Sequence, residues 1–376
     1  MRIAKFLVIC LLSTALLTGC GQNSANVPAP VAAATLPENN ASMPTSIALL
    51  LPLQGPLASI GYAVKQGFLA AAQASGNPPH ITLVDTTKEP SMQAAYNKAI
   101  NHNAQFVVGP LSKSHVQTLA GLQLSTPVLA LNYLARDIST PLELYQFGLS
   151  PVDEAQQATL TAWQSGYRSA LIITTNGAWG SQVGQAFAEQ WETLGGKVVD
   201  RLTLSQNIAA LTRQVSDFLQ FKPPHKRRTD FDVIFLASDP KMGRQVNPLL
   251  KFFYAGDIPV YATASIYSSL SHSRRLDNDL NGIIFCSAPW TIGEHISDSS
   301  LYEQLQSRFP EFFKRDRSYY ALGVDALHIV QQLPYLSESY VLPGATGQLT
   351  LNNQRRIVRE LVCAQFRRGA ISFLQF

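Results

Sequence analysis

The chain has 376 residues, of which 46% are hydrophobic and 14% charged, and its formal net charge at pH 7 is +4. This hydrophobic content is normal for a globular protein, and so small a positive excess argues against a nucleic-acid-binding surface. The length exceeds what one hydrophobic core usually supports, so we expect two lobes of about 150 residues each.

The amino terminus predicts a signal peptide over residues 1–19. Arg2 and Lys5 precede an apolar run at 6–17, and Leu17-Thr18-Gly19-Cys20 follows. This order of charge, apolar core and small residues is typical of secretory leaders. A transmembrane anchor is the weaker alternative, because the run is shorter than the roughly 20 residues that span a bilayer.

The order leucine, small residue, glycine, cysteine resembles the bacterial lipobox. The resemblance implies that the leader is cut before Cys20 and that this cysteine becomes the lipid anchor. Loss of Arg2 and Lys5 would lower the net charge to +2. Gly21 stands where an aspartate would signal retention in the inner membrane, which favours the outer membrane. Residues 20–46 then form a lipidated cysteine with a disordered tether, since they hold four prolines and Glu38 as the one charge.

From Ile47 onward, short apolar strands alternate with amphipathic helices. We expect strands at 47–51, 81–84, 106–108, 128–131, 170–174, 198–204, 233–236, 260–263 and 282–286. Helices are expected at 61–74, 92–102, 152–164, 179–194, 209–221 and 241–253, with one more capped by Ser112. A helical stretch at 318–333 and a β-like stretch at 347–376 complete the chain.

Continuous apolar strands separated by helices indicate an α/β protein whose parallel sheets are covered on both faces. The pattern restarts after Ser150, which predicts two lobes. We assign 47–148 plus about 288–335 to the first lobe, and 149–287 plus about 336–376 to the second.

Chemical motifs give no support for catalysis. The sequence lacks Gly-x-Ser-x-Gly, His-Glu-x-x-His, Cys-x-x-Cys and phosphate-loop spacings, and its seven histidines lack metal-ligand spacing. We therefore expect no enzyme activity, no metal and no cofactor. A cell-wall hydrolase in particular would need residues that are not present.

Two further features leave alternatives open. Cys286 and Cys363 remain once the leader and the lipidated cysteine are set aside. They either pair in an oxidising compartment or stay as small buried hydrophobes. The basic run at 222–228 is interpreted as a solvated loop in preference to a polyanion site.

Several segments carry a resemblance to the type I periplasmic-binding-protein fold. They are IALLLPLQGP at 47–56, GYAVKQGF at 61–68, VGPLS at 108–112 and YALGVDA at 320–326. The resemblance implies two doubly wound parallel-sheet lobes joined by crossing strands, with a cleft between them.

A narrower match involves DVIFLA at 232–237, QVNPLLKFFYAGDIPVYAT at 245–263 and LNGIIFCSAPW at 280–290. These segments resemble the penicillin-binding protein activator family, LpoA type. Long members carry a helical-repeat domain before this fold, and here the tether occupies that place, as in a short form.

The resemblance implies a non-enzymatic outer-membrane lipoprotein. Such a protein binds and activates a class A penicillin-binding protein and so promotes peptidoglycan synthesis, with peptidoglycan as a possible second partner. The alternative is a lipid-anchored solute-binding protein for an amino acid or amide importer.

Two sets of candidate residues follow. Ligands in open parallel sheets lie beyond the carboxyl ends of the strands, and the resemblance places some of these positions near the hinge. The cleft candidates are Gln54, Gly55, Pro56, Ser112, Asn132, Tyr133, Trp179 and Asp325. Simple helix capping is the favoured explanation for Ser112, and Trp179 is as well explained by core packing.

The partner-surface candidates are Arg244, Tyr261, Tyr267 and Trp290, chosen because arginine and aromatic residues dominate interface energetics. Core packing is the alternative for each aromatic.

Overall fold

The structure is a computed structural model that describes residues 43–135, 138–205, 207–268, 277–293 and 297–374. The expected leader, Cys20 and most of the expected tether lie outside the described residues. Within the described ranges, no helix is long and apolar enough to cross a membrane.

The first sheet contains five parallel strands in the order β2-β1-β3-β4-β5. They are β1 (Ser46–Leu51), β2 (His80–Asp85), β3 (Phe106–Val108), β4 (Val128–Ala130) and β5 (Leu144–Gln146). Alternate residues of β1 enter two separate cores: Ile47, Leu49 and Leu51 on one face, Ala48 and Leu50 on the other. Because successive side chains of a strand point to opposite faces, a run without polar residues requires cover on both.

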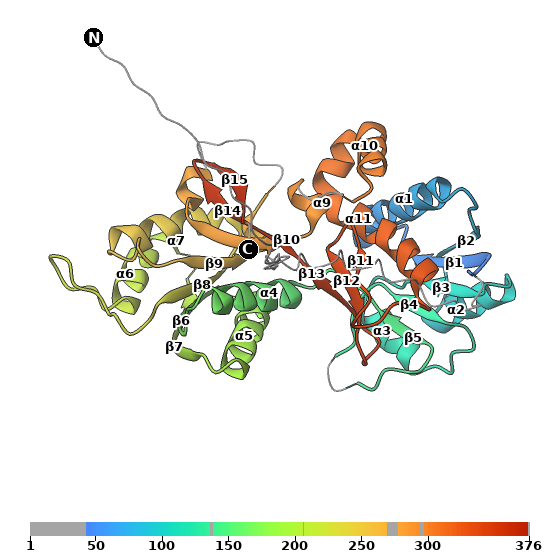
Figure 1. Ribbon diagram of the computed structural model, residues 1–376. Helices are drawn as coiled ribbons and strands as arrows, with labels where there is room; N and C mark the ends of the chain where they lie inside the picture. The colour runs from blue at the N-terminus through green and yellow to red at the C-terminus, as the bar shows by residue number, and fades with distance from the viewer. Residues whose placement is uncertain (1–42, 136–137, 206, 269–276, 294–296, 375–376) are drawn as a thin grey trace, which may run out of the picture. The chain divides into compact units, whose positions relative to one another are not determined.

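Helices α2 (Met92–Asn101) and α3 (Lys113–Ala120) cover one face of this sheet, and α1 (Ala58–Ala74) with α11 (Pro310–Gln332) covers the other. Figure 1 shows α1 and α11 side by side. Their close approach requires glycine: a Cβ on Gly67 would lie 2.1 Å from the carbonyl oxygen of Tyr320, and one on Gly323 2.1 Å from that of Val64. The glycines of two family-like segments therefore permit helix packing.

The second sheet contains seven strands in the order β15-β14-β10-β9-β8-β6-β7. They are β6 (Ser169–Thr175), β7 (Lys197–Leu204), β8 (Val233–Ala237), β9 (Val260–Thr263), β10 (Ile283–Ser287), β14 (Val362–Arg367) and β15 (Ala370–Phe373). Strands β6 to β10 are parallel, while β14 runs antiparallel to β10 and β15 antiparallel to β14. The parallel-sheet α/β architecture is thus confirmed.

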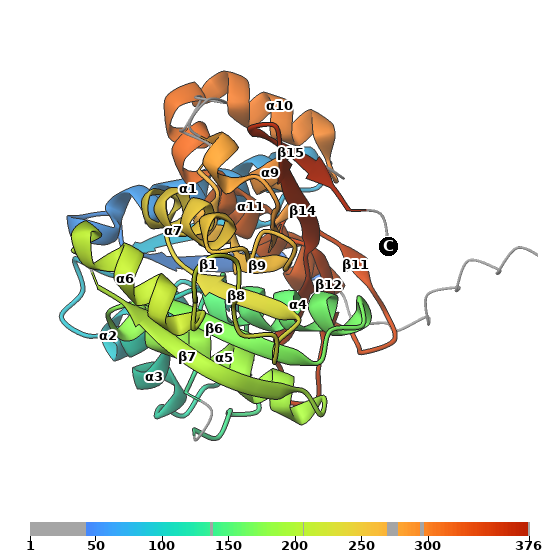
Figure 2. The same ribbon diagram turned by 90° about the vertical axis from the view of Figure 1, so that its left-hand side faces the viewer.

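Two helices cover each face of the second sheet (Figure 2). They are α4 (Pro151–Gln164) and α5 (Ala178–Thr193) on one face, α6 (Ile208–Phe218) and α7 (Pro240–Phe252) on the other. The fully buried Trp191 of α5 packs on Phe187 and Trp163, with ring centroids 5.5 and 5.7 Å away.

After β10 the chain returns to the first core, and more residues belong to this core than we expected. This return includes α9 (Pro289–Ile292), α10 (Ser299–Arg308), α11 and the small sheet of β11 (Leu342–Pro343), β12 (Gln348–Leu351) and β13 (Ile357–Glu360). Leu336, Ala345, Leu349 and Ile357 all belong to the first core. The boundary that we placed at about 336 therefore lies near 360, where β14 enters the second sheet. Strand β5 and helices α9 and α10 were not predicted, because such short elements carry little periodicity.

Candidate functional site: a polar groove beside a buried charge network

A groove of about 1250 Å³ is lined by the turn after β4, the start of α4, one face of α5 and the segment that ends in β13. Its polar lining residues include Lys113, Asn132, Tyr133, Asp153, Gln156, Gln157, Gln182, Gln185, Gln190, Asn352, Asn353, Arg355, Arg356 and Arg359. Amide groups thus line much of the wall and cations outnumber carboxylates. Such a surface can form hydrogen bonds with a polar, preferably anionic, group.

Asn132 fixes the turn that presents Tyr133. Its amide nitrogen donates to the carbonyl of Leu111 at 2.8 Å, and its Oδ1 accepts from the main-chain N–H of Tyr133 at 2.9 Å. The turn residue after a strand is thereby tied to the preceding βα loop. The buried phenol ring of Tyr133 can then lie in one fixed place.

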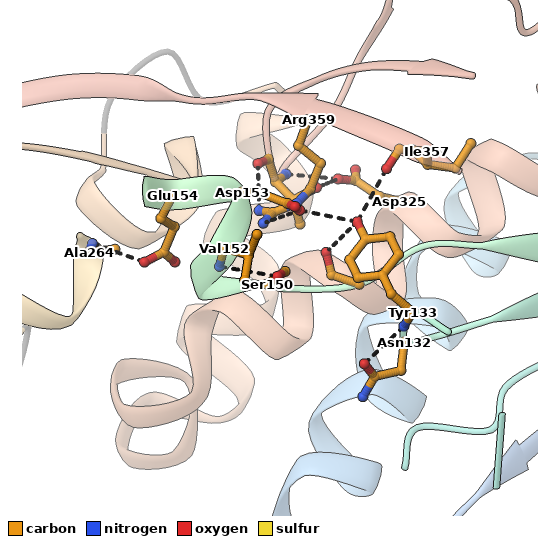
Figure 3. A network of polar contacts seen from close by, with 12 residues as sticks. Asn132, Tyr133, Ser150, Val152, Asp153, Glu154, Ala264, Asp325, Ile357 and Arg359 are labelled. Atoms are coloured by element: carbon orange, nitrogen blue, oxygen red, sulfur yellow. Dashed lines mark hydrogen bonds and ion pairs between the residues drawn. The ribbon is translucent and has the colours of Figure 1, made fainter. Parts of the chain in front are cut away.

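Three acceptors surround the Tyr133 hydroxyl (Figure 3). The carbonyls of Gly148 and Ile357 lie at 3.1 and 3.2 Å, and Oδ2 of Asp153 at 3.3 Å. The hydroxyl has one proton, so it donates to one acceptor at a time. Burial and the nearby Asp153 raise the pKa of the Tyr133 phenol, which keeps it a donor at neutral pH.

Asp153 and Glu154 lie in the first turn of α4, which Pro151 begins and Ser150 caps by accepting from the N–H of Val152 at 3.2 Å. Carboxylates are favoured at this end of a helix by its dipole. Burial raises the pKa of Asp153, opposed by Arg359 and Arg356. Burial likewise raises the pKa of Glu154 to about 7, opposed by Arg359 and by the N–H of Ala264, which donates to Oε2 at 3.0 Å.

Arg359 of β13 supplies the buried cation of the network. Its side chain is 2% exposed, and its Nη2 lies 3.6 Å from Oδ2 of Asp153. Burial alone would lower its pKa, but the neighbouring Tyr133, Asp153 and Glu154 leave the pKa of Arg359 raised. Its Nε and Nη2 form no hydrogen bond within the described part of the chain. Arg356 places its guanidinium 4.3 Å from the centre of the Tyr133 ring. The network joins the β4 turn, α4 and β13 into one unit.

Two of the eight predicted cleft residues, Asn132 and Tyr133, line this groove, and the other six do not. Gln54, Gly55 and Pro56 are exposed around the η1 turn (Gly55–Leu57). Trp179 packs against the core between α4, α5 and the second sheet. Ser112 caps α3 by accepting from the N–H of His115 at 3.3 Å. A cap needs only local geometry, so the favoured explanation suffices for Ser112.

Asp325 is a structural residue in the middle of α11. It is fully buried, and its carboxylate accepts from the N–H groups of Ala345 and Thr346 at 2.7 Å each and from the Thr346 hydroxyl at 2.6 Å. Burial raises the pKa of Asp325, opposed by these hydrogen bonds. The predicted cleft role is therefore wrong: the aspartate faces the turn before β12, because α11 lies inside the core.

The predicted partner anchors are not free surface residues. Trp290 is fully buried and Tyr261 is 2% exposed. Tyr267 stacks on Phe285 with centroids 5.5 Å apart, and Arg244 forms an ion pair with Asp277 at 2.6 Å. Aromatic residues in or next to the central strands of a sheet that is covered on both faces are usually buried in a hydrophobic core. We chose these anchors by residue type alone, and that choice took no account of burial.

Sequence reasoning missed Asp153, Glu154, Arg356 and Arg359. A signal for Arg359 was available: Ile357, Arg359 and Leu361 alternate along the β-like stretch and share one face, and all three are buried. A charge on the inner face of a strand predicts a buried partner. The acidic pair directly after Ser150-Pro151 was also visible, although such pairs are common at helix starts.

Cys286 and Cys363 face each other across the antiparallel pair of β10 and β14, and a disulfide bond joins them. Elsewhere in the described ranges, no group of three or more His, Cys, Asp or Glu side chains could hold a metal ion.

Comparison with known proteins places this chain among bacterial lipoproteins. The family described as LppC putative lipoprotein matches residues 20–369. Penicillin-binding protein activator LpoA from Photobacterium profundum is 29% identical over 354 residues, which cover 87% of this chain and 56% of that protein. The protein of the same name from Vibrio cholerae is 28% identical over 350 residues, covering 86% and 57%. The chain thus spans a little over half the length of these curated relatives.

Among solved structures, this chain is similar to the LpoA (YraM) C-domain from Haemophilus influenzae, which is described as a regulator of PBP1A. The two superpose with a TM-score of 0.74 at 25% identity, and the superposition covers 88% of this chain and 100% of that domain. A putative branched-chain amino acid ABC transporter protein from Rhodospirillum rubrum superposes with a TM-score of 0.67 at 17% identity, which shows a shared fold alone. Because the family match extends over nearly the whole sequence, this chain belongs to the LppC putative lipoprotein family.

Proposed function

We propose that this chain binds a class A penicillin-binding protein and raises its peptidoglycan synthesis, without catalysing a reaction itself. One observation carries the proposal: the chain matches the whole of the Haemophilus influenzae LpoA C-domain, a regulator of PBP1A. We therefore expect a regulatory surface of that domain to have a counterpart in this chain.

The lipobox-like segment that ends in Cys20 supports an outer-membrane location. We propose that the acylated cysteine holds the protein in the outer membrane and that the tether lets the folded part meet a synthase across the periplasm. More than one acyl chain is needed for stable anchoring. Replacing Cys20 by serine should prevent acylation and leader cleavage. Mass spectrometry of the amino terminus decides this, and an unmodified Cys20 in mature protein from the membrane fraction would contradict it.

The functional test uses the full-length lipidated protein in detergent with its cognate class A synthase and lipid-linked precursor. We expect faster glycan polymerisation or crosslinking with the protein present, together with a measurable complex. A solute-binding lipoprotein of the same fold serves as the matched control. Unchanged synthesis with no complex at micromolar concentrations would refute the proposal, and a rise in Tm with a single amino acid would then favour the solute-binding alternative.

A further inference from the structure

An exposed aromatic and basic surface lies at the loops that precede β8 and β9, and the groove does not include it. Phe252 at the end of α7 is 70% exposed and Tyr254 is 47% exposed. The exposed Lys222, His225 and Lys226 stand on the neighbouring loop between α6 and β8. We call these five residues the aromatic platform. Large aromatic side chains exposed together on a folded lobe are typical of interaction sites.

Tyr254 is held in place within the platform by contacts with its neighbours. Tyr254 has a φ of 62°, a left-handed conformation rarely adopted by residues with a large side chain. Its ring stacks on Phe221 with centroids 6.0 Å apart, and the ring of His225 lies edge-on to it at 4.8 Å. Its carbonyl accepts from Nε of Arg227 at 2.6 Å. A fixed aromatic loses little conformational entropy on binding, which favours affinity.

The basic residues of the 222–228 run form two groups: the arginines make ion pairs within the fold, and the lysines are exposed at the surface. Nη2 of Arg227 donates to both carboxylate oxygens of Asp257, at 2.8 and 2.9 Å. Arg228 pairs with both Asp200 and Asp230 at 2.8 Å. Lys222 and Lys226 are exposed, and no ion pair of either occurs within the described ranges.

The two lysines are kept together by the backbone. The N–H of Lys222 donates to the carbonyl of Lys226 at 2.7 Å, and the reverse bond measures 3.0 Å. The tip of the loop therefore presents two cations next to His225, whose ring contacts that of Tyr254. The first half of the run is exposed, as expected of a solvated loop, while Arg227 and Arg228 in its second half form ion pairs that anchor the fold.

We propose that the aromatic platform is the surface on which the synthase docks, through an acidic patch with an apolar recess that receives Phe252. This inference rests on the proposed function and specifies its contact surface. The charge of Lys222 and Lys226 requires carboxylates on the partner, and the protruding ring of Phe252 requires a recess. Aromatic anchors surrounded by charged residues are typical of interface hot spots.

The surroundings favour a protein partner over a lipid bilayer. The side chains of Asp200, Asp230 and Asp257 are 48, 52 and 68% exposed next to the platform. An anionic bilayer would approach these carboxylates as well as the lysines, and two lysines supply only about 1 kcal/mol each to such binding. A protein surface can place its own charges to match a mixed pattern.

Four forms of the full-length lipidated protein test the inference: wild type, Phe252→Ala, the double variant Lys222→Glu/Lys226→Glu, and a matched control. The control combines Phe312→Ala, whose ring is 58% exposed on α11, with Lys88→Glu at another exposed position. Binding to the cognate synthase is measured by biolayer interferometry at 50 and 300 mM salt. Stimulation of synthesis, binding to anionic lipid vesicles and pull-down by isolated peptidoglycan are measured in parallel, and circular dichroism monitors folding.

We expect Phe252→Ala to weaken synthase binding at least ~10-fold, the range of hot-spot truncations. The lysine double variant should bind weakly and lose the salt dependence seen for wild type, while the control behaves as wild type. If both platform variants bind and stimulate the synthase as wild type does, the aromatic platform is not the docking surface, and the proposed function is unaffected. A loss confined to vesicle or peptidoglycan binding would also overturn it. Absence of any wild-type complex with the synthase would refute the proposed function itself.

Discussion

The hydroxyl of Tyr133 lies 3.2 Å from the main-chain carbonyl of Ile357, a residue 224 positions later in the chain. The same hydroxyl is within 3.3 Å of Oδ2 of Asp153 in α4. The phenol of Tyr133 thus joins its own turn after β4 to helix α4 and to strand β13 (Figure 3). The arrangement of these three segments depends on a buried polar group.

Tyr133→Phe should lower the free energy of unfolding by about 1–2 kcal/mol, because the variant leaves buried acceptors without their donor. Urea unfolding followed by circular dichroism measures this. The exposed Tyr62, changed to Phe, is the control and should stay within about 0.5 kcal/mol of wild type. Equal stability of the two variants would show that the hydroxyl does not hold these segments together.

Asp325→Ala should destabilise the chain by about 3 kcal/mol, since it removes the acceptor of two buried N–H groups and one hydroxyl. Asp325→Asn should lie between, because an amide retains one accepting oxygen. Chemical denaturation is again the measurement, with Asp217→Ala as control, whose side chain is 72% exposed. A mild effect at Asp325 would contradict its role in fixing the turn at 345–346.

Glu154 predicts a pH dependence of stability. Its pKa is raised from an ordinary 4.5 to about 7, so the folded chain holds this proton more tightly than the unfolded chain. Stability should therefore fall as the pH rises through this interval and level off above about 7. Glu154→Gln removes this loss while keeping an acceptor for the N–H of Ala264.

Relative to wild type, Glu154→Gln should gain on the order of 2 kcal/mol between pH 5 and pH 8, a figure reduced for partial solvent access. Urea midpoints at both pH values provide the comparison. Glu192→Gln, on the exposed face of α5, is the matched control. A difference between variant and wild type that does not change with pH would rule out titration of Glu154 in this interval.

The disulfide between Cys286 and Cys363 predicts that neither thiol reacts with an alkylating reagent before reduction, and that both react afterwards. Intact-mass measurement distinguishes the two cases. Replacing both cysteines by alanine should lower stability by about 3 kcal/mol, because the bond closes a loop of 77 residues in the unfolded chain. Two alkylated thiols in the unreduced protein would contradict the bond.

Most strands and helices followed from local pattern. After Ser46, every residue of β1 is apolar, so residues 47–51 must be buried on both faces of the sheet whatever surrounds them. Ser112 and Ser150 start helices through contacts within three residues. Such signals depend only on residues close in sequence, which is why the α/β class and the starts of α1 to α7 could be predicted to within three residues. The start of α11 at Pro310 was missed, as were α9 and α10.

The site could not be predicted in the same way, because it depends on contacts between residues far apart in the chain. Asp153, Arg359 and Tyr133 come from three separate segments, and only the packing of those segments brings their charges together. The burial of Trp290 and Tyr261, and the exposure of Phe252 in the same family-like region, are likewise tertiary results. By itself the sequence determined most strands and the starts of α1 to α7, which depend on neighbours along the chain, and it predicts a leader and a lipobox outside the described residues. Tertiary structure alone decided which aromatic faces water and which charge meets its partner, since both depend on neighbours in space.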